Sequence, residues 1–113
     1  MVVCGGLGGT MESACRGAKQ AGGLTVGLLP GSDRDEANPF VDVALPTGLG
    51  EARNALVVGA ADIVIAVGRG YGTLSEIALA LRAGKRVIGL DTWDVEGVAP
   101  ADGPEAAVSA ALS

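Results

Sequence analysis

The chain contains no histidine, and it is poor in aromatic residues and in lysine. Without histidine, neither a Ser-His-Asp nor a Cys-His catalytic arrangement can form, and histidine-containing metal sites are excluded. Only two lysines occur and the net charge is −5, so no basic stripe is available to neutralise a nucleic-acid backbone. The sequence also lacks an apolar run of about 20 residues, which a membrane-spanning helix requires. We therefore expect neither nucleic acid nor a membrane among its partners.

Cysteine is scarce as well. Cys4 falls within an apolar run, and Cys15 falls on the apolar face of a helical pattern. Two cysteines at this separation do not make a zinc site, so we expect no metal site and no required cofactor. We interpret both as reduced core thiols, as is typical of a cytoplasmic protein.

Small aliphatic residues take the place of the missing aromatic ones. Hydrophobic residues make up 49% of the 113 residues, with only one Trp, one Tyr and one Phe, which favours a parallel sheet covered by Ala-rich helices. Strands are predicted at 2–4, 24–29, 41–45, 62–67 (the most clearly buried one) and 86–90, helices at 10–21, 51–60, 74–83 and from 104 on, and a mobile polar loop at 32–39. This alternation predicts a single α/β domain over residues 1–113 with a mainly parallel sheet.

Two glycine-rich stretches each connect an apolar run to a helical pattern. The first glycine stretch comprises Gly5, Gly6, Leu7, Gly8, Gly9, Thr10 and Met11, and the second glycine stretch comprises Gly68, Arg69, Gly70, Tyr71, Gly72 and Thr73. A strand that passes through glycines into a helix leaves unpaired N–H groups at the helix start and lets a ligand approach the backbone closely. Together with the helix dipole, this favours an anion such as phosphate. In a parallel sheet both stretches lie beyond the carboxyl ends of the strands, so we expect their amides to converge on one pocket.

Arg53, Asn54 and Glu76 are further candidates for a ligand site. Arg53 lies early in a helix at the same end of the sheet, where its guanidinium either holds a phosphate with two donors or is a solvated surface group. Glu76 can polarise a ribose hydroxyl, stabilise a cationic sugar intermediate, or merely interact favourably with the helix dipole. Thr73 can cap its helix or donate to a phosphate, and Arg69 is either a phosphate contact or simply exposed.

These motifs, in this order, resemble a known group of proteins. The first glycine stretch, residues 21–31, Ala52-Arg53-Asn54 and the second glycine stretch through Glu76 follow the pattern of the Rossmann-like superfamily (SLOG) that contains the molybdenum-cofactor carrier proteins, the Lonely Guy phosphoribohydrolases and DNA-processing protein A. The resemblance covers about residues 2–91 and is greatest for the carrier-like branch. It implies a Rossmann-like three-layer sandwich. Relatives place a further strand and helix before the first glycine stretch, so this chain is expected to begin at their second strand.

The resemblance implies a phosphate-bearing small molecule as the ligand: a nucleoside monophosphate, phosphate itself or the molybdenum cofactor. Arg53 and Glu76 match the two residues that carry N-glycosidic bond hydrolysis in the Lonely Guy enzymes, whereas Val67, Arg69 and Asn54 replace a proline, a glycine and a lysine of their pattern. Some relatives are labelled lysine decarboxylases, but neither Lys19 nor Lys85 lies in a plausible cofactor loop.

Three functions therefore stay open: a binding or carrier protein, a nucleoside 5′-monophosphate phosphoribohydrolase, and a non-catalytic assembly module. Members of the group commonly form dimers, so the resemblance implies a homodimer or a higher homo-oligomer.

Overall fold

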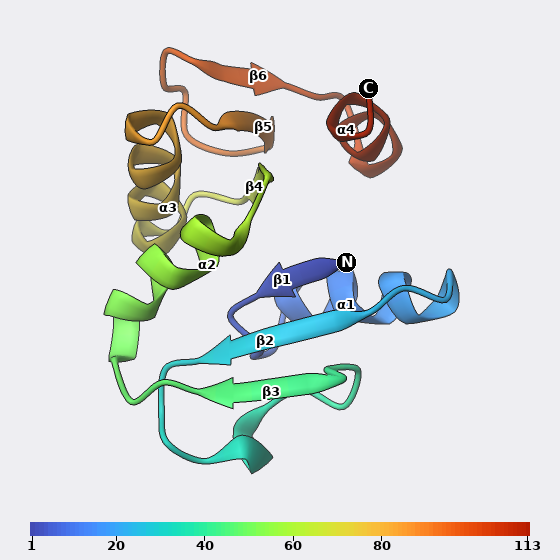
Figure 1. Cartoon of the computed structure of the whole chain (residues 1–113). Helices are drawn as coiled ribbons and strands as arrows, with labels where there is room; N and C mark the ends of the chain where they lie inside the picture. Colours follow the sequence, from blue (N-terminus) through green and yellow to red (C-terminus); the bar gives the residue numbers. More distant parts are fainter. The chain divides into compact units, whose positions relative to one another are not determined.

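The computed structural model describes all 113 residues as strands and helices that largely alternate (Figure 1). The strands are β1 (Val2–Cys4), β2 (Thr25–Leu29), β3 (Val43–Pro46), β4 (Ile63–Val67), β5 (Arg86–Leu90) and β6 (Val98–Pro100). The helices are α1 (Thr10–Gln20), α2 (Asn54–Ala60), α3 (Tyr71–Arg82) and α4 (Pro104–Ala111), with 3₁₀ turns at Arg34–Glu36 and Gly50–Arg53. Residues 1–60 and residues 61–113 form two compact units. The predicted α/β class with parallel strands is confirmed.

In residues 1–60, three parallel strands form a sheet in the order β1-β2-β3. β2 is the middle strand, and three consecutive residues, 27–29, are buried. Because successive side chains of a strand point to opposite faces, β2 is covered on both faces, which explains its apolar sequence. Helix α1 packs on β1 and β2 and buries Cys15 completely.

In residues 61–113, three parallel strands form a second sheet in the order β4-β5-β6. Helices α3 and α4 both pack on β4 and β5. The core of this unit contains five apolar residues that are each at most 1% exposed: Ile77, Ala80, Val87, Ile88 and Ala107. The sequence reasoning missed β6, a three-residue strand that ends in proline; an edge position tolerates proline because no second neighbour needs its missing N–H.

The structure corrects two of the sequence-based expectations and adds detail to a third. β4 is an edge strand that pairs only with β5, and both Ile65 and Val67 are 36% exposed, so the prediction of a buried strand is wrong for these side chains. The predicted helix at 51–60 is α-helical only from Asn54, because a 3₁₀ turn precedes it. The predicted loop at 32–39 contains a 3₁₀ turn that the carboxylate of Asp33 caps, accepting from the N–H of Asp35 at 2.9 Å.

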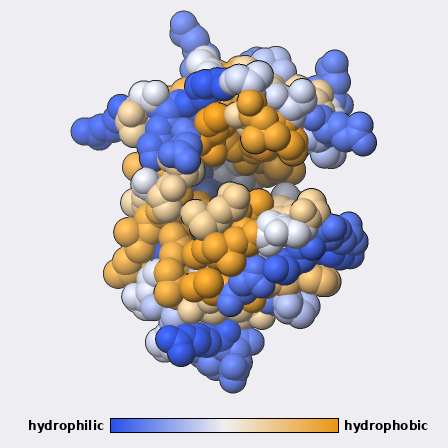
Figure 2. All heavy atoms as spheres, turned by 45° about the vertical axis from the view of Figure 1, so that its right-hand side comes forward, coloured by the Kyte–Doolittle hydropathy of each residue, from blue (hydrophilic) through white to orange (hydrophobic).

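Apolar side chains are visible on the surface of the molecule (Figure 2). Leu45 on β3 and Val67 on β4 are among the large apolar residues that solvent reaches. Each of these strands lies at one end of its sheet, so the edge position accounts for the exposure. No helix of the structure combines the length and the apolar character that crossing a membrane requires.

Candidate functional site

The first glycine stretch connects β1 to α1 and is tightly packed where it begins. Gly6 has a φ of +77°, and a Cβ there would lie 2.7 Å from Cδ2 of Leu29 and 3.2 Å from Cα of Gly27. Residues with a side chain avoid both this conformation and such contacts, so only glycine fits. At Gly8 and Gly9, by contrast, a Cβ would meet no atom within 4 Å. The stretch therefore packs on β2 at its start and is open at its end.

Arg53 lies directly against this stretch. The residue is only 5% exposed, and a Cβ at Gly5 would lie 2.6 Å from its Nη2 and 2.8 Å from Sδ of Met11. Its Nη1 donates to Oδ1 of Asn54 at 2.5 Å, whereas its Nε is buried without a hydrogen-bond partner. The interpretation of Arg53 as a solvated surface group is therefore wrong.

Asn38 holds the carbonyl groups of the first glycine stretch, and the sequence reasoning missed it. This residue is 7% exposed; its Nδ2 donates to the carbonyl of Leu7 at 2.9 Å, and its backbone N–H donates to the carbonyl of Gly6 at 2.8 Å. Its Oδ1 accepts from the N–H of Phe40 at 3.0 Å. No signal in the sequence separates Asn38 from its polar neighbours, because its role depends on contacts with residues 31 and 32 positions away.

The second glycine stretch is held in a similar way but lies in open surroundings. A Cβ at Gly68 or Gly70 would meet no atom within 4 Å. The hydroxyl of Thr92 donates to the carbonyl of Gly68 at 2.6 Å, and Nε1 of Trp93 donates to the carbonyl of Gly70 at 2.9 Å. Neither residue was predicted, although their position directly after β5 is a usable signal, since loops that follow neighbouring parallel strands meet at one end of a sheet.

The held carbonyls determine where the N–H groups of the two stretches point. In a trans peptide, the carbonyl and the N–H of the following residue point in opposite directions, and the chain contains no cis peptide. The carbonyls that bond to Asn38 precede the N–H groups of Leu7 and Gly8, which therefore point away from it. The N–H groups of Arg69 and Tyr71 follow the held carbonyls of the second stretch in the same way. Each stretch thus directs two N–H groups away from the residues that hold it.

Both helices that follow the glycine stretches begin without a side-chain cap. Gly9 is the N-cap residue of α1 and Gly70 that of α3, and neither helix start receives a side-chain hydrogen bond. The first N–H groups of both helices therefore have no side-chain acceptor from the protein. Thr73 does not cap α3, so that interpretation is wrong; its hydroxyl lies 3.5 Å from the carbonyl of Val67.

Two exposed residues extend from the second glycine stretch. Nη2 of Arg69 lies 3.4 Å from Oδ1 of Asp91, with 68% and 93% of the two side chains exposed, so this ion pair contributes little to stability. Tyr71 is 83% exposed and stacks on Trp93, with ring centroids 5.9 Å apart and an interplanar angle of 24°. Arg69 is thus exposed, and Tyr71 presents an open aromatic surface.

The structure assembles the predicted site residues in two groups. In residues 1–60 it brings together the first glycine stretch, Arg53 and Asn54. In residues 61–113 it places Glu76 on α3, half-buried, in the helix that follows the second glycine stretch. Convergence of the two groups on one pocket stays a prediction.

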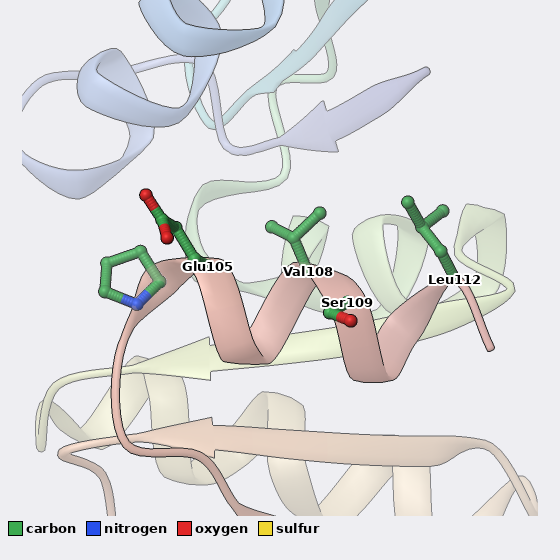
Figure 3. A pocket seen from close by; sticks show the side chains of 5 residues that line it. Glu105, Val108, Ser109 and Leu112 are labelled. Carbon is green, nitrogen blue, oxygen red and sulfur yellow. The ribbon is translucent and has the colours of Figure 1, made fainter.

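A hollow of about 560 Å³ lies along α4, where Pro104, Glu105, Val108, Ser109 and Leu112 line it (Figure 3). None of the predicted site residues belongs to this lining. A smaller cavity of about 280 Å³ is lined by residues that include Arg69, Asp91, Thr92 and Trp93. The second glycine stretch therefore borders a cavity, whereas the hollow along α4 is separate from the candidate site residues.

The two cysteines are free and adjacent, next to the first glycine stretch. Sγ of Cys4 lies 3.5 Å from Sγ of Cys15 and accepts from the N–H of Gly6 at 3.3 Å. Burial raises the pKa of the Cys4 thiol to about 11, although the N–H of Gly6 opposes this shift. The thiol is therefore protonated and a poor nucleophile at neutral pH.

Comparison with known proteins places the chain in a family. A family model described as the SLOG cluster4 family matches residues 1–111. An uncharacterised protein of Archaeoglobus fulgidus is 46% identical over 114 residues, which cover 100% of this chain and 75% of that protein.

Solved structures of high similarity include two whose descriptions name the molybdenum cofactor. A molybdenum cofactor binding protein from the phototrophic bacterium Rippkaea orientalis has a TM-score of 0.89 and 42% identity, covering 97% of this chain and 74% of that one. The molybdenum cofactor carrier protein of Chlamydomonas reinhardtii has a TM-score of 0.84 and 37% identity, with the same coverage of 97% and 74%. As the sequence resemblance predicted, the chain belongs to the SLOG cluster4 family, and its structural neighbours include molybdenum cofactor carrier proteins.

Proposed function

We propose that this chain binds a phosphate-bearing small molecule of the molybdenum-cofactor type, with the anionic group held by the first glycine stretch and Arg53. The similar structures from Rippkaea orientalis and Chlamydomonas reinhardtii support this choice of ligand class, since both are described as binding or carrying that cofactor. Nucleoside monophosphates carry the same anionic group and are a second ligand of this class.

The environment of Arg53 is the observation that carries the proposal. A guanidinium bears a full positive charge, and here it is buried and donates a hydrogen bond to the neutral side-chain amide of Asn54. Its Nε has no partner at all. A buried charge without an opposite charge is costly, and an unsatisfied buried donor adds to that cost. An anion bound at the first glycine stretch supplies the missing negative charge.

The backbone of the same stretch complements the arginine. The N–H groups of Leu7 and Gly8 point away from Asn38, and Gly8 and Gly9 leave the end of the stretch open to an approaching ligand. The uncapped start of α1 adds N–H groups and the positive end of the helix dipole. Residues 5–11 and Arg53 therefore fit the phosphate of such a ligand.

Thermal unfolding with and without ligand tests the proposal. The probes are inorganic phosphate, AMP, GMP and molybdenum cofactor freshly released from a molybdenum enzyme. We expect the phosphate-bearing organic ligands to raise the melting temperature in a concentration-dependent way. The variant Arg53→Met replaces the guanidinium by an unbranched apolar side chain. It is expected to weaken binding by tenfold or more, since a hydrogen bond to a charged group is worth about 1.5–3 kcal/mol.

The control variant Arg82→Met removes an exposed arginine in the last turn of α3, outside the predicted site, and is expected to leave binding unchanged. If no probe shifts the melting temperature of the unaltered chain, the binding function is refuted and an assembly role becomes the better explanation. Release of free adenine from AMP, abolished by Glu76→Gln, would instead identify a phosphoribohydrolase.

A further inference from the structure

We propose that Cys4 and Cys15 form a reversible disulfide when the protein meets a peroxide, and that this disulfide weakens anion binding at the first glycine stretch. The inference rests on the proposed function and concerns the regulation of the same site. All the residues that it involves lie within residues 1–60, which form one compact unit.

The two thiols are already close enough to react with each other. Cys4 ends β1 and Cys15 lies in the second turn of α1, and their Sγ atoms are 3.5 Å apart. Both thiols are free. A disulfide bond is about 2.05 Å long, so the two sulfur atoms need to approach each other by only about 1.5 Å. A small movement therefore suffices to join the end of β1 to α1.

The unequal exposure of the two thiols determines the order of the reaction. Cys15 is 0% exposed whereas Cys4 is partly exposed, so a peroxide reaches Cys4 first. The Cys4 thiolate attacks a peroxide oxygen, the O–O bond breaks, and the leaving hydroxide takes up the thiol proton as water, which leaves a sulfenic acid. Sγ of Cys15 then attacks Sγ of Cys4, the S–O bond breaks, and the hydroxyl group leaves with the Cys15 proton as a second water. The thiols lose two electrons, and the peroxide gains them.

The backbone next to Cys4 belongs to the candidate anion site. Sγ of Cys4 accepts from the N–H of Gly6 at 3.3 Å, and Gly5 follows Cys4 directly. A Cβ at Gly5 would lie 2.6 Å from Nη2 of Arg53 and 2.8 Å from Sδ of Met11, so the backbone there is in close contact with both side chains. The sulfur of Cys4 is thus one residue away from the contact with the guanidinium.

Tight packing transmits the movement of the sulfur atoms to this contact. Gly6 cannot shift toward β2, because a Cβ there would already lie 2.7 Å from Leu29 and 3.2 Å from Gly27. Drawing the end of β1 and α1 together therefore displaces the backbone at residue 5 from Arg53 or moves the start of α1. Either change separates groups that the proposed site uses together, so the oxidised chain should hold an anion less well.

A purely structural role for the two thiols makes a different prediction. If Cys4 and Cys15 only fill space between β1 and α1, brief treatment with peroxide produces no link between them. The affinity for a ligand is then the same in oxidising and in reducing buffer.

Mass spectrometry of the peroxide-treated chain detects the disulfide. Hydrogen peroxide is added at about pH 8.5, since the raised pKa of Cys4, about 11, leaves little thiolate at neutral pH. We expect the mass to fall by about 2 Da and to return with dithiothreitol, whereas oxidation of methionine adds about 16 Da that dithiothreitol does not remove. Proteolytic cleavage after Glu12 separates the two cysteines unless the disulfide joins them. Absence of the joined peptides would overturn the proposal.

Titration with GMP compares the dithiol and disulfide forms. The disulfide form is expected to bind GMP about fivefold more weakly or worse, which is the lower end of the usual coupling between two sites. Dithiothreitol should restore the affinity. Because such coupling is reciprocal, saturating GMP should shift the chain toward the dithiol by the same factor in a glutathione redox buffer.

Cys4→Ala is the matched control. This variant cannot form the disulfide, keeps Met11 and leaves Cys15 buried. It should bind GMP as the reduced chain does, both before and after peroxide treatment. A loss of affinity in the treated variant would assign the effect to oxidation of Met11 and refute the switch. Cys15→Ala is a second variant that should form no internal link.

The possible failures are distinguishable. If the disulfide forms and GMP binds equally well to both forms, the switch is refuted and the phosphate site stands. If the reduced chain binds neither GMP nor any other probe of the proposed function, that function fails and the switch fails with it, even where mass spectrometry detects the disulfide.

Discussion

The two glycine stretches have similar sequences but different surroundings. The first begins in a packed environment, where Gly6 lies against Gly27 and Leu29 and where Gly5 adjoins the buried guanidinium of Arg53. The second leaves open space around Gly68 and Gly70 and bears an exposed arginine and an exposed tyrosine.

This difference shows that one sequence motif can be placed in two different environments. Both stretches lead from a strand into an uncapped helix, and in both a distant side chain holds the loop carbonyls. In the first stretch the guanidinium of Arg53 is buried against the backbone, and this burial strengthens its attraction to an anion. In the second stretch the side chains of Arg69 and Tyr71 are exposed, so each can change its conformation. We infer that the first stretch, with the buried guanidinium of Arg53, is the better suited of the two to hold a phosphate.

The packing of the first stretch gives the largest expected effect. Gly6→Ala introduces a Cβ at a φ of +77° and within 2.7 Å of Leu29, so it should lower the free energy of unfolding by about 3 kcal/mol. Gly8→Ala, with no atom near its Cβ, is the matched variant and should change stability by less than about 1 kcal/mol. Urea denaturation measures both. Equal stabilities would show that the first stretch is not packed as described.

The two arginines should differ in the absence of ligand. Arg53→Met replaces a buried, incompletely bonded guanidinium by an apolar side chain, and we expect the free energy of unfolding to rise by about 1 kcal/mol or more. Arg69→Met should leave stability nearly unchanged, because its ion pair is exposed. Calorimetric melting of the ligand-free variants measures the difference. A marked loss of stability in Arg53→Met would mean that the guanidinium serves the fold rather than a ligand.

The thiol beside the first stretch predicts a pH dependence at alkaline pH. Because burial raises the pKa of Cys4 to about 11, above its ordinary value of 9.0, the folded protein favours the protonated thiol. The unfolded chain ionises first, so the stabilisation is complete below about pH 9 and is lost between pH 9 and pH 11. Urea denaturation across this range should show the decline, and Cys4→Ser should flatten it. An unchanged profile in the variant would contradict the raised pKa.

The ion pairs of the two regions give the smallest expected effect. Nζ of Lys19 lies 2.9 Å from Oδ2 of Asp42, and the N–H of Thr25 donates to the same oxygen. Both contacts lower the pKa of the Asp42 carboxyl below its ordinary value of 3.8. The stabilisation is therefore present above about pH 3.8 and is lost as the pH falls below it, so Asp42→Asn should reduce the drop in stability on acidification. Asp91→Asn, in the exposed pair with Arg69, should leave the acid profile almost unaltered. Acid titration followed by circular dichroism compares the two.

The sequence predicted the local elements well and the long-range contacts poorly. The helices that follow the glycine stretches could be predicted from apolar periodicity and from glycine, and so could all five predicted strands, within one or two residues of their ends. The burial of Arg53 could not be predicted from the sequence, because an arginine at the start of a helix is far more often solvated. Asn38 and Trp93 were missed for the same reason: each acts through a hydrogen bond to a residue more than 20 positions away.

By itself the sequence determined the α/β class, the two glycine stretches and the family, because periodicity and motif order are properties of neighbouring residues. Only the tertiary structure decided that Arg53 is buried with an unsatisfied donor, that β4 is an exposed edge, and that Tyr71 meets Trp93. Burial and pairing depend on which distant segments pack together. Local sequence patterns do not specify that packing, and the folded chain does.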